Sequence, residues 1–566
     1  MRKKIFAGVL TTAVLGTVVA FPGLGSAEGK AHNASDVEKA HRTKTIQQVE
    51  RYLYENKSSA KLSTRSVTAQ EVTDATFTGS IDFSGAHLYK IHVSQGGTIH
   101  INSNAEQGEH FYTLIPLSAV DSDPDMPAMY FDGDTIPAGD YYFMVESLEE
   151  WSVPYRYNVN GVTMTVDTTV PQINLTSPAK NPFRMAKGAK TVNLTGSVSE
   201  SASVYLSVDG SNDEQLGTTF NKTLTLEIGD HTVYMMAEEA SENMVFKTLE
   251  ITNPGVKRID GADRYAVSAN ISKENYPYGT DTILIARGDL YTDALSGGPL
   301  AAALQAPVLL TNPKSLPAPI KAEITRLGAK QAIMLGGIDS VTPAVEQQLK
   351  DLGLETKRID GADRFAVSAN VGQALTDLGF EPQKAIIASG LNFPDALSAS
   401  SPAGQYFYPI LQVSTDKVPA SVEAYIKQNG IRDFVIVGGS DTVSDNVLNR
   451  LKTLTGGNVD RVGGANRFAV GVNLIKYFFD TEFFGMDPRN LVVANGMIFS
   501  DALPGGPLAA NRYAPILLTT ATKIDASVTN YLQNELPDYY TDVVYILGGT
   551  DSVSTGIQSY FNGLIK

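Results

Sequence analysis

Six arginines recur at fixed spacing within residues 257–566, in three copies of one short motif. They are Arg258 and Arg264, Arg358 and Arg364, and Arg461 and Arg467. The acids between them are not repeated, because Asp260 and Asp360 give way to Gly463. Arginine that paired only with these acids would lose its partner in the third copy. The guanidinium groups therefore either face outward, where their planar fork suits carboxylate or phosphate, or brace a helix and a loop inside each copy.

Three aspartates follow at equivalent places, each in an Asp-Ala-Leu sequence at the expected start of a helix. They are Asp293, Asp395 and Asp501. A carboxylate at this place can accept hydrogen bonds from free helix amides and is favoured by the helix dipole. A salt bridge to a motif arginine and direct contact with a ligand are the alternatives.

A pair of glycines closes the last strand of each copy, in the pattern Gly-Gly-x-Asp-x-Val. The pairs are Gly336 and Gly337, Gly438 and Gly439, and Gly548 and Gly549. Glycines at the carboxyl end of a parallel strand let backbone amides approach an anion, and they also suit a plain tight turn. No Walker lysine and no Gly-x-Gly-x-x-Gly motif accompanies them, which argues against nucleotide binding. We predict these arginines, aspartates and glycines as the ligand-binding residues.

The elements that must position these residues alternate between strand and helix. In the first copy, the expected strands are residues 281–286, 306–311 and 331–335, and the expected helices are 292–305, 319–327 and 343–352. Apolar strands separated by helices predict a parallel sheet covered on both faces. The copies span 255–355, 356–457 and 458–566.

The first 254 residues have a different pattern. Arg2, Lys3 and Lys4 precede an apolar run, and Gly25 and Ala27 fit a signal-peptidase site, so residues 1–27 are predicted to direct secretion. A linker or stalk with a short helix is expected over 28–66. Period-two runs then predict two β-sandwiches over 67–165 and 166–254.

Composition excludes several classes of function. The formal charge of −16 argues against nucleic acid as a partner, and no later apolar run is long enough to span a membrane. All seven histidines precede the repeats and cysteine is absent, so no Ser-His-Asp or Cys-His unit can form within them. A paired-carboxylate hydrolase needs neither residue, but the acids differ between copies. We predict no enzyme, cofactor or metal, reading Asp121–Asp125 as an acidic surface loop rather than a calcium loop.

The motifs quoted above, with Pro307-Val-Leu-Leu310 and the Leu-Gly-Gly triplets, make residues 257–566 similar to the cell wall binding repeat 2 family. This resemblance implies three Toprim-like α/β modules in a pseudo-threefold trimer, borne by an exported Gram-positive surface protein. It also implies noncovalent attachment to an anionic wall polymer. Gln412 and Ser400-Ser401 depart from the family pattern in the second copy.

Residues 67–165 resemble a bacterial pre-peptidase C-terminal domain through Ala138-Gly-Asp-Tyr-Tyr-Phe143. Residues 166–254 resemble a bacterial immunoglobulin-like spacer, and this resemblance implies a turn over residues 239–243 before a final strand. The sequence therefore predicts a secreted protein that is bound noncovalently to the wall and displays two β-sandwiches. The alternative is an accessory or delivery partner of wall hydrolases, since the same repeats occur in autolysins and their accessory proteins.

Overall fold

The computed structural model describes residues 70–81, 85–103, 111–117, 130–146, 153–199, 202–211, 214–380, 382–479, 489–536 and 541–566. The predicted signal peptide, the stalk and the Asp121–Asp125 loop lie outside these residues. Residues 254–566 form one compact unit, here called the repeat unit, and the described residues up to 253 form another, the β unit.

The first part of the β unit is a set of antiparallel strands around an aromatic core. The strands are β1 (Gln70–Ile81), β2 (Ala86–Gln95), β3 (Gly97–Thr98), β4 (His100–Ser103), β5 (Phe111–Pro116), β6 (Thr135–Ile136), β7 (Gly139–Glu146) and β8 (Val153–Val166). Strand β8 pairs with β1, β2 and β4. Phe77, Tyr89, Phe143 and Tyr157 from these strands lie in one buried cluster, so alternate residues of each strand supply the core.

The second part of the β unit holds eight strands in two sheets. The strands are β9 (Ile173–Ser177), β10 (Phe183–Arg184), β11 (Thr191–Val198), β12 (Ser203–Val208), β13 (Glu214–Leu216), β14 (Thr219–Thr225), β15 (Gly229–Glu238) and β16 (Met244–Asn253). A three-stranded sheet is ordered β14-β11-β9. Its Leu194 and Leu224 share a buried cluster with Val233 and Leu249 of the larger sheet, so apolar side chains from both sheets form this core.

The two parts of the β unit are joined through the turn between β15 and β16. Strand β16 pairs with β2, with Val245 opposite His87. The buried Asn243 side chain accepts a hydrogen bond from Lys90 N and donates to Asp167 O and Thr169 O. Glu242 is ion-paired with Lys90. The predicted turn over residues 239–243 is confirmed. Its hydrogen bonds and ion pair also connect the two β regions.

The repeat unit contains three four-stranded sheets. The strands are β17 (Gly255–Ile259), β18 (Thr282–Arg287), β19 (Val308–Thr311), β20 (Gln331–Leu335), β21 (Glu355–Ile359), β22 (Lys384–Ser389), β23 (Ile410–Val413), β24 (Asp433–Val437), β25 (Val459–Val462), β26 (Asn490–Asn495), β27 (Ile516–Thr519) and β28 (Val543–Leu547). All pairings in these sheets are parallel, which confirms that prediction.

Helices alternate with these strands. They are α3 (Arg264–Asn275), α4 (Gly297–Ala303), α5 (Ala318–Leu327), α6 (Pro343–Asp351), α7 (Arg364–Asp377), α8 (Pro394–Gln405), α9 (Ala420–Gln428), α10 (Asp445–Thr455), α11 (Arg467–Phe479), α12 (Gly505–Asn511), α13 (Ala526–Asn530) and α14 (Thr555–Leu564), with short turns η1 (Ala294–Ser296) and η2 (Tyr531–Glu535). The helix expected over 292–305 is divided into η1 and α4, where Gly297-Gly298-Pro299 follows η1.

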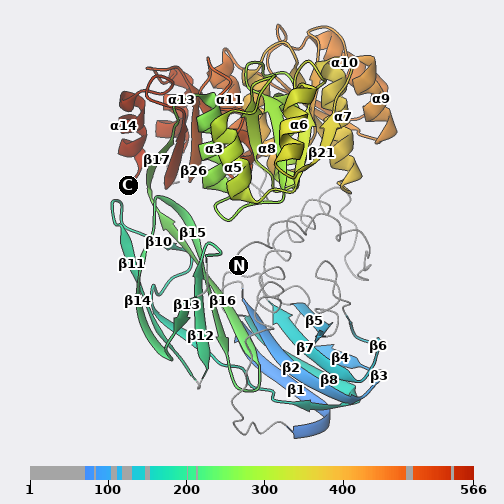
Figure 1. Cartoon of the computed structure of the whole chain (residues 1–566), viewed down its shortest axis with the longest axis vertical. Helices are drawn as coiled ribbons and strands as arrows, with labels where there is room; N and C mark the ends of the chain where they lie inside the picture. The colour runs from blue at the N-terminus through green and yellow to red at the C-terminus, as the bar shows by residue number, and fades with distance from the viewer. Residues whose placement is uncertain are drawn as a thin grey trace. The chain divides into compact units, whose positions relative to one another are not determined.

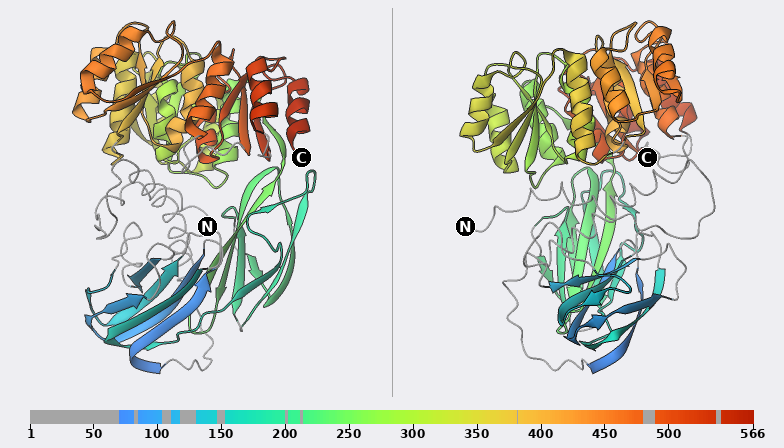
Figure 2. Two further views of the ribbon diagram at one scale, coloured as in Figure 1. Left: turned by 180° about the vertical axis from the view of Figure 1, so that it is seen from behind. Right: turned by 90° about the vertical axis from the view of Figure 1, so that its right-hand side faces the viewer.

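The first strand of each sequence copy completes the sheet of the preceding copy. Sheet 1 is ordered β19-β18-β20-β21, sheet 2 is β23-β22-β24-β25, and sheet 3 is β17-β28-β26-β27. Strand β17 therefore leaves the first copy and pairs with β28 of the third, with Arg258 opposite Ile546. The green β17 lies beside the red C-terminal strands in Figures 1 and 2. This pairing closes the three copies into a ring.

Each sheet is covered on both faces. In sheet 1, Ile283 and Ile285 lie in a buried cluster with residues of α3, α5 and α6. Leu284 points to the opposite face, where a methyl group at Gly297 of α4 would lie 3.7 Å from its Cδ2 atom. Aliphatic residues thus cover both surfaces of a strand, as a buried parallel sheet requires.

The copies meet where α4, α8 and α12 pack through small residues. A methyl group at Gly404 of α8 would lie 2.8 Å from Ala510 Cβ and 3.2 Å from Ala302 Cβ, on the other two copies. Ser401 Oγ donates to Ala514 O, and Gln412 Nε2 donates to Thr292 O. The second-copy departures Gln412 and Ser401 thus serve contacts between copies.

We expect Gly404→Leu to lower the free energy of unfolding of the repeat unit by about 2–3 kcal/mol, because the added side chain overpacks the contact between α8, α12 and α4. Urea denaturation followed by circular dichroism measures this change. Gly563→Ala is the matched control, since Gly563 also lies in a helix but a methyl group there would have no heavy atom of the described residues within 4 Å. It should be neutral or stabilise by up to about 1 kcal/mol. Equal losses in both variants would contradict the close packing of the three helices.

Candidate functional site

The first arginine of each motif holds the glycine turn of the sheet that its strand completes. Arg258 Nη1 donates to Gly548 O at 2.8 Å, and Arg358 Nη1 donates to Gly336 O at 2.9 Å. Arg461 Nη1 donates to Gly438 O at 3.1 Å. The Nη2 atom of each guanidinium donates to a side chain of a helix that packs on the same sheet. In chain order of the arginines, the acceptors are Gln558, Glu346 and Asp445. The bracing interpretation of these arginines is confirmed.

The second arginine of each motif holds another loop. Arg264, Arg364 and Arg467 open helices α3, α7 and α11, and their Nη1 atoms donate to Gly288 O, Gly390 O and Gly496 O at 2.6, 2.6 and 2.7 Å. Each of these glycines directly follows the second strand of its copy. The guanidinium thereby fixes the loop between that strand and the aspartate that follows.

The three aspartates lie beneath the glycine turns. Ser340 Oγ donates to Asp293 Oδ2 at 2.6 Å, and Ser552 Oγ donates to Asp501 Oδ2 at 2.5 Å. The expected capping role is wrong for Asp293, because its carboxylate accepts no hydrogen bond from the helix that it precedes. The nearby hydroxyl of the Gly-Gly-x-Asp-Ser turn is its partner instead.

The surroundings of Asp395 alter the pKa of its carboxyl group. Asp395 is 8% exposed, and burial raises the pKa of its carboxyl to about 6, while the positive charge of Arg467 opposes part of that shift. Arg467 belongs to the third copy and also lies over the Phe393 ring, 5.9 Å from its centroid. The charge of the second-copy aspartate is therefore coupled to the neighbouring copy.

The first glycine of each pair is required by its backbone conformation. Gly336, Gly438 and Gly548 have φ values of 97°, 111° and 95°. A methyl group at Gly336 would lie 2.2 Å from Asp293 Oδ2. The tight-turn interpretation is confirmed for these three glycines. A methyl group at the second glycine, as at Gly337, would have no heavy atom of the described residues within 4 Å, so this position is open.

The strand exchange assembles the predicted residues into three composite sites. Asp293, Gly336 and Gly337 of the first copy meet Arg358, which the sequence assigns to the second copy. Equivalent sets join Asp395, Gly438 and Gly439 with Arg461, and Asp501, Gly548 and Gly549 with Arg258. The second arginines Arg264, Arg364 and Arg467 stand one loop away, at Gly288, Gly390 and Gly496.

Three aromatic rings meet at the same contact between copies. Tyr291, Phe393 and Phe499 each precede a site aspartate by two residues, and their ring centroids are 5.6–5.7 Å apart. Tyr291 Oη donates to Leu391 O. The neighbouring Leu391 and Met497 side chains are 50% and 58% exposed. The loops that carry the site aspartates are thus held together by aromatic packing.

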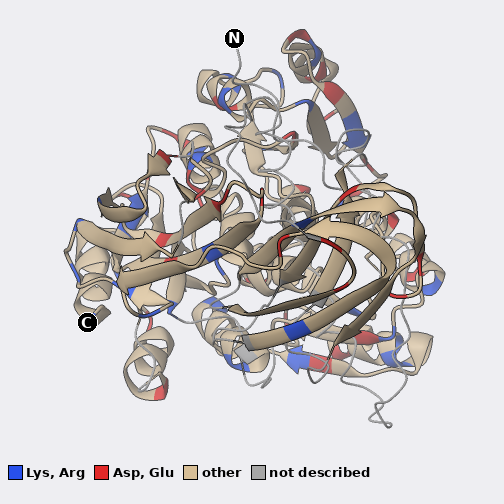
Figure 3. Cartoon of the chain, turned by 90° about the horizontal axis from the view of Figure 1, so that it is seen from below, with Lys and Arg blue, Asp and Glu red and all other residues tan. Residues whose placement is uncertain are grey.

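A cavity that the sequence did not predict lies beside Arg258. Its volume is about 440 Å³, and it lies between β17, α3 and the end of α5. The lining residues are Lys257, Arg258, Ile259, Asp260, Asn270, Lys273, Glu274, Pro277 and Arg326. Four cations against two acids make it positive, although acidic and basic positions are interspersed over the protein as a whole (Figure 3). The sequence feature that could have indicated this cavity is Lys257, which directly precedes the motif residue Arg258.

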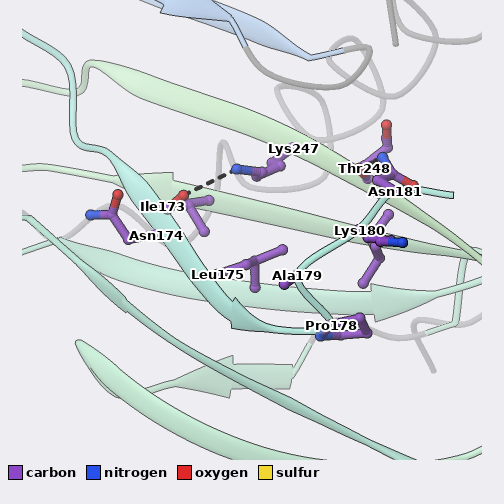
Figure 4. A pocket seen from close by; sticks show the side chains of 10 residues that line it. Ile173, Asn174, Leu175, Pro178, Ala179, Lys180, Asn181, Lys247 and Thr248 are labelled. Carbon is purple, nitrogen blue, oxygen red and sulfur yellow. Dashed lines mark hydrogen bonds between the residues drawn. The ribbon is translucent and has the colours of Figure 1, made fainter. Parts of the chain in front are cut away.

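A smaller cavity of about 200 Å³ lies in the β unit, between β9 and β16 (Figure 4). Lys247 stands in the inward row of β16 with Val245 and Leu249, and its Nζ atom donates to Ile173 O at 3.3 Å. Among the described residues no cluster of three or more His, Asp or Glu side chains could hold a metal ion. No helix within the described ranges is long and apolar enough to cross a membrane.

Comparison with known proteins agrees with this architecture. Residues 258–346, 358–448 and 461–558 match the family model of cell wall binding domain 2. The solved structure of Cwp6 from Clostridium difficile is similar with a TM-score of 0.55 and 23% identity, covering 70% of this chain and 68% of that one. This likeness shows a shared fold.

Two curated relatives come from Bacillus subtilis (strain 168). N-acetylmuramoyl-L-alanine amidase LytC is 28% identical over 316 residues, which are 56% of this chain and 60% of LytC. The amidase enhancer is 28% identical over 302 residues, which are 53% of this chain and 39% of that protein. The chain thus spans less than two thirds of the length of either relative.

The repeat unit is built of three tandem cell wall binding domain 2 repeats, which define a class of wall-binding proteins. The protein is a cell-wall-binding surface protein, associated with the wall through this unit.

Gly336→Ala should lower the free energy of unfolding by about 1–3 kcal/mol, since a methyl group there meets the Asp293 carboxylate and forces an unfavourable φ. Gly337→Ala, one residue on, should change it by less than about 0.5 kcal/mol. Thermal or urea denaturation of both variants measures the difference. Similar values for the two would show that the turn does not rest on the aspartate.

The raised pKa of Asp395 predicts that the stability of the folded protein depends on pH. The pKa of this carboxyl is raised on folding, so its stabilising contribution is complete below about pH 4 and is lost as pH rises through about 6. Asp395→Asn should therefore change the difference in unfolding free energy between pH 4 and pH 7 by about 2–3 kcal/mol relative to wild type. Asp416→Asn, at an exposed position, should keep the wild-type profile. Urea titrations at several pH values measure this, and unchanged profiles in both variants would refute the assignment.

Proposed function

We propose that the repeat unit binds an anionic glycopolymer of the wall, teichoic acid or a related polymer, without a covalent bond. The observation that carries this proposal is the composite site, which occurs three times with the same chemistry. Each site places an open glycine, such as Gly337, beside an arginine guanidinium that is half-buried under the turn. Backbone amides of a glycine turn near a fixed positive charge suit a phosphate or carboxylate.

Three such sites on one closed unit support binding to a repetitive polymer. After one segment of the polymer is bound, the next site meets the neighbouring segment at a high effective concentration. Weak contacts at each site can then sum to firm attachment. We further propose that the modules are Toprim-like and form a pseudo-threefold trimer, in keeping with the contacts among α4, α8 and α12.

In this proposal the protein is secreted by the signal at residues 1–27, and the β unit is displayed from the wall as a non-catalytic part. Its two regions are proposed to be the pre-peptidase C-terminal-like and immunoglobulin-like β-sandwiches. Their shared strand pairing between β2 and β16 and the bonds of Asn243 favour display as one stiff body.

A second candidate function is supported by the relatives. One curated relative is named an amidase and another an amidase enhancer, and both match over about the length of the repeat unit. Under this candidate, the protein assists or delivers a wall hydrolase. The two candidates share wall attachment and differ in what the β unit contacts.

Wall binding is tested by sedimentation of the purified full chain with intact Gram-positive walls. We expect the protein to pellet at low salt and to be released as salt is raised, because interactions between exposed charges are screened. Walls stripped of their anionic polymers should retain much less protein. Equal pelleting with intact and stripped walls would contradict the anionic ligand.

The accessory candidate is tested by release of free amines and reducing ends from purified peptidoglycan. The protein alone should release neither. A rise in release when the protein is added to a wall amidase would favour the accessory function, and release by the protein alone would show an enzyme.

A further inference from the structure

The cavity beside Arg258 differs between the three copies in a way that bears on binding. In the first copy, the same cavity is lined by Lys257 of β17, Lys273 of α3 and Arg326 near the end of α5. Lys257 is paired with Glu274 at 2.8 Å, and Arg326 is paired with Glu323 at 2.7 Å. Lys273 is exposed and has no ion pair or side-chain hydrogen bond among the described residues.

The second copy keeps two of the four cations that line this cavity. By their distance from the motif arginine and from the start of the helix, Gln373 replaces Lys273 and Gln428 replaces Arg326. The Gln373 side chain is occupied by hydrogen bonds with Asp377 and Asn429. Lys357 and Arg358 are the cations that remain at the equivalent places.

In the third copy an acid replaces one of these cations. Asp460 replaces Lys257 and accepts a hydrogen bond from Tyr477 Oη. Lys476, the counterpart of Lys273, is ion-paired with Glu535 and lies over the Tyr531 ring. Asn534 stands in place of Arg326. An anion arriving at this copy would meet a carboxylate and an already neutralised lysine.

We propose that the first-copy cavity is an anion-binding subsite for one charged group of the wall polymer, so that the three copies do not contribute equally. This inference rests on the proposed function and names residues for it. Lys273 supplies an unpaired ammonium among the described residues, while Arg326 and Arg258 supply guanidinium groups held by internal partners. A volume of about 440 Å³ admits a charged group together with part of a sugar ring.

Placement at the ring closure strengthens the proposal. The cavity lies where β17, now part of sheet 3, faces α3 and α5 of the first copy. Strand β17 pairs on one side, with β28, so its outer edge faces this space. Asn270 Nδ2 holds the Asp260 carbonyl at 2.6 Å, which fixes the loop at the cavity rim. The guanidinium groups of Arg258 and Arg326 are held by internal hydrogen bonds before a ligand arrives, which lowers the entropic cost of binding.

The test compares three variants of the full chain in sedimentation with intact walls: Lys273→Gln, Lys273→Glu and the control Lys321→Gln. Lys321 is an exposed lysine of α5 that does not line the cavity, so its loss removes the same charge elsewhere. Lys273 is preferred to Arg326 because loss of Arg326 would leave the buried Glu323 without its cation. Matching thermal unfolding curves establish that all variants are folded.

We expect Lys273→Gln to raise the dissociation constant roughly tenfold and Lys273→Glu to raise it further, as for loss of one charge-assisted hydrogen bond. Lys321→Gln should change it less than about twofold. Walls treated to remove phosphodiester polymers separate the sources: a Lys273 effect that disappears identifies a phosphate group, and one that persists identifies a carboxylate.

Equal dissociation constants for the wild type and all three variants would overturn the subsite while leaving wall binding intact. Equal weakening by Lys321→Gln and Lys273→Gln would also overturn it, since it would show an effect of net charge alone. A wild-type chain that does not pellet with intact walls would overturn the proposed function itself.

Discussion

The pairing of β17 with β28 is the constraint on which the repeat unit depends. Each copy has three strands of its own sheet and takes its fourth from the following copy, and the third copy takes it from the first. No copy is therefore complete without a neighbour, and opening any one junction exposes a parallel strand edge that water must solvate. The same constraint explains the role of the first motif arginine. This arginine lies on the exchanged strand and donates a hydrogen bond to the glycine turn of the sheet that the strand joins.

The motif arginines act as internal braces that hold the proposed binding surface in place. All six donate to backbone carbonyls, which places the glycine turns and the loops before the site aspartates. In the first copy the exposed Lys273 adds a cation without an ion pair among the described residues, at a position where the copies have diverged. Residues that repeat thus serve the shared architecture, and residues that differ can divide the binding among the copies.

The β unit depends in a similar way on one joint. The loop between β15 and β16 ends in Asn243, whose amide is fully buried and bonds to the backbone of residues 90, 167 and 169. A buried amide with its hydrogen bonds satisfied fixes one geometry, because any shift would leave polar atoms without partners. The added strand pairing between β2 and β16 extends the larger sheet across both regions.

The sequence alone determined the class of fold in the repeat unit and its wall association. Apolar runs such as residues 281–286 and 331–335, alternating with helical stretches, require parallel sheets because only buried strands are apolar on both faces. The repeated motifs carried the family resemblance, and the need for glycine at Gly336 could be read as a tight turn.

Tertiary structure decided which copy each residue serves. Arg358 belongs by sequence to the second copy but bonds to the glycine turn of the first. Arg258 belongs to the first copy and bonds to Gly548 of the third, 290 residues away in the sequence. Asp293 was expected to cap a helix but bonds Ser340, which is distant in the chain and adjacent in space. Lys257, Lys273 and Arg326 share a cavity through the same exchange of strands. Spacing along a chain fixes local periodicity, whereas contacts between separate strands depend on how the ring closes.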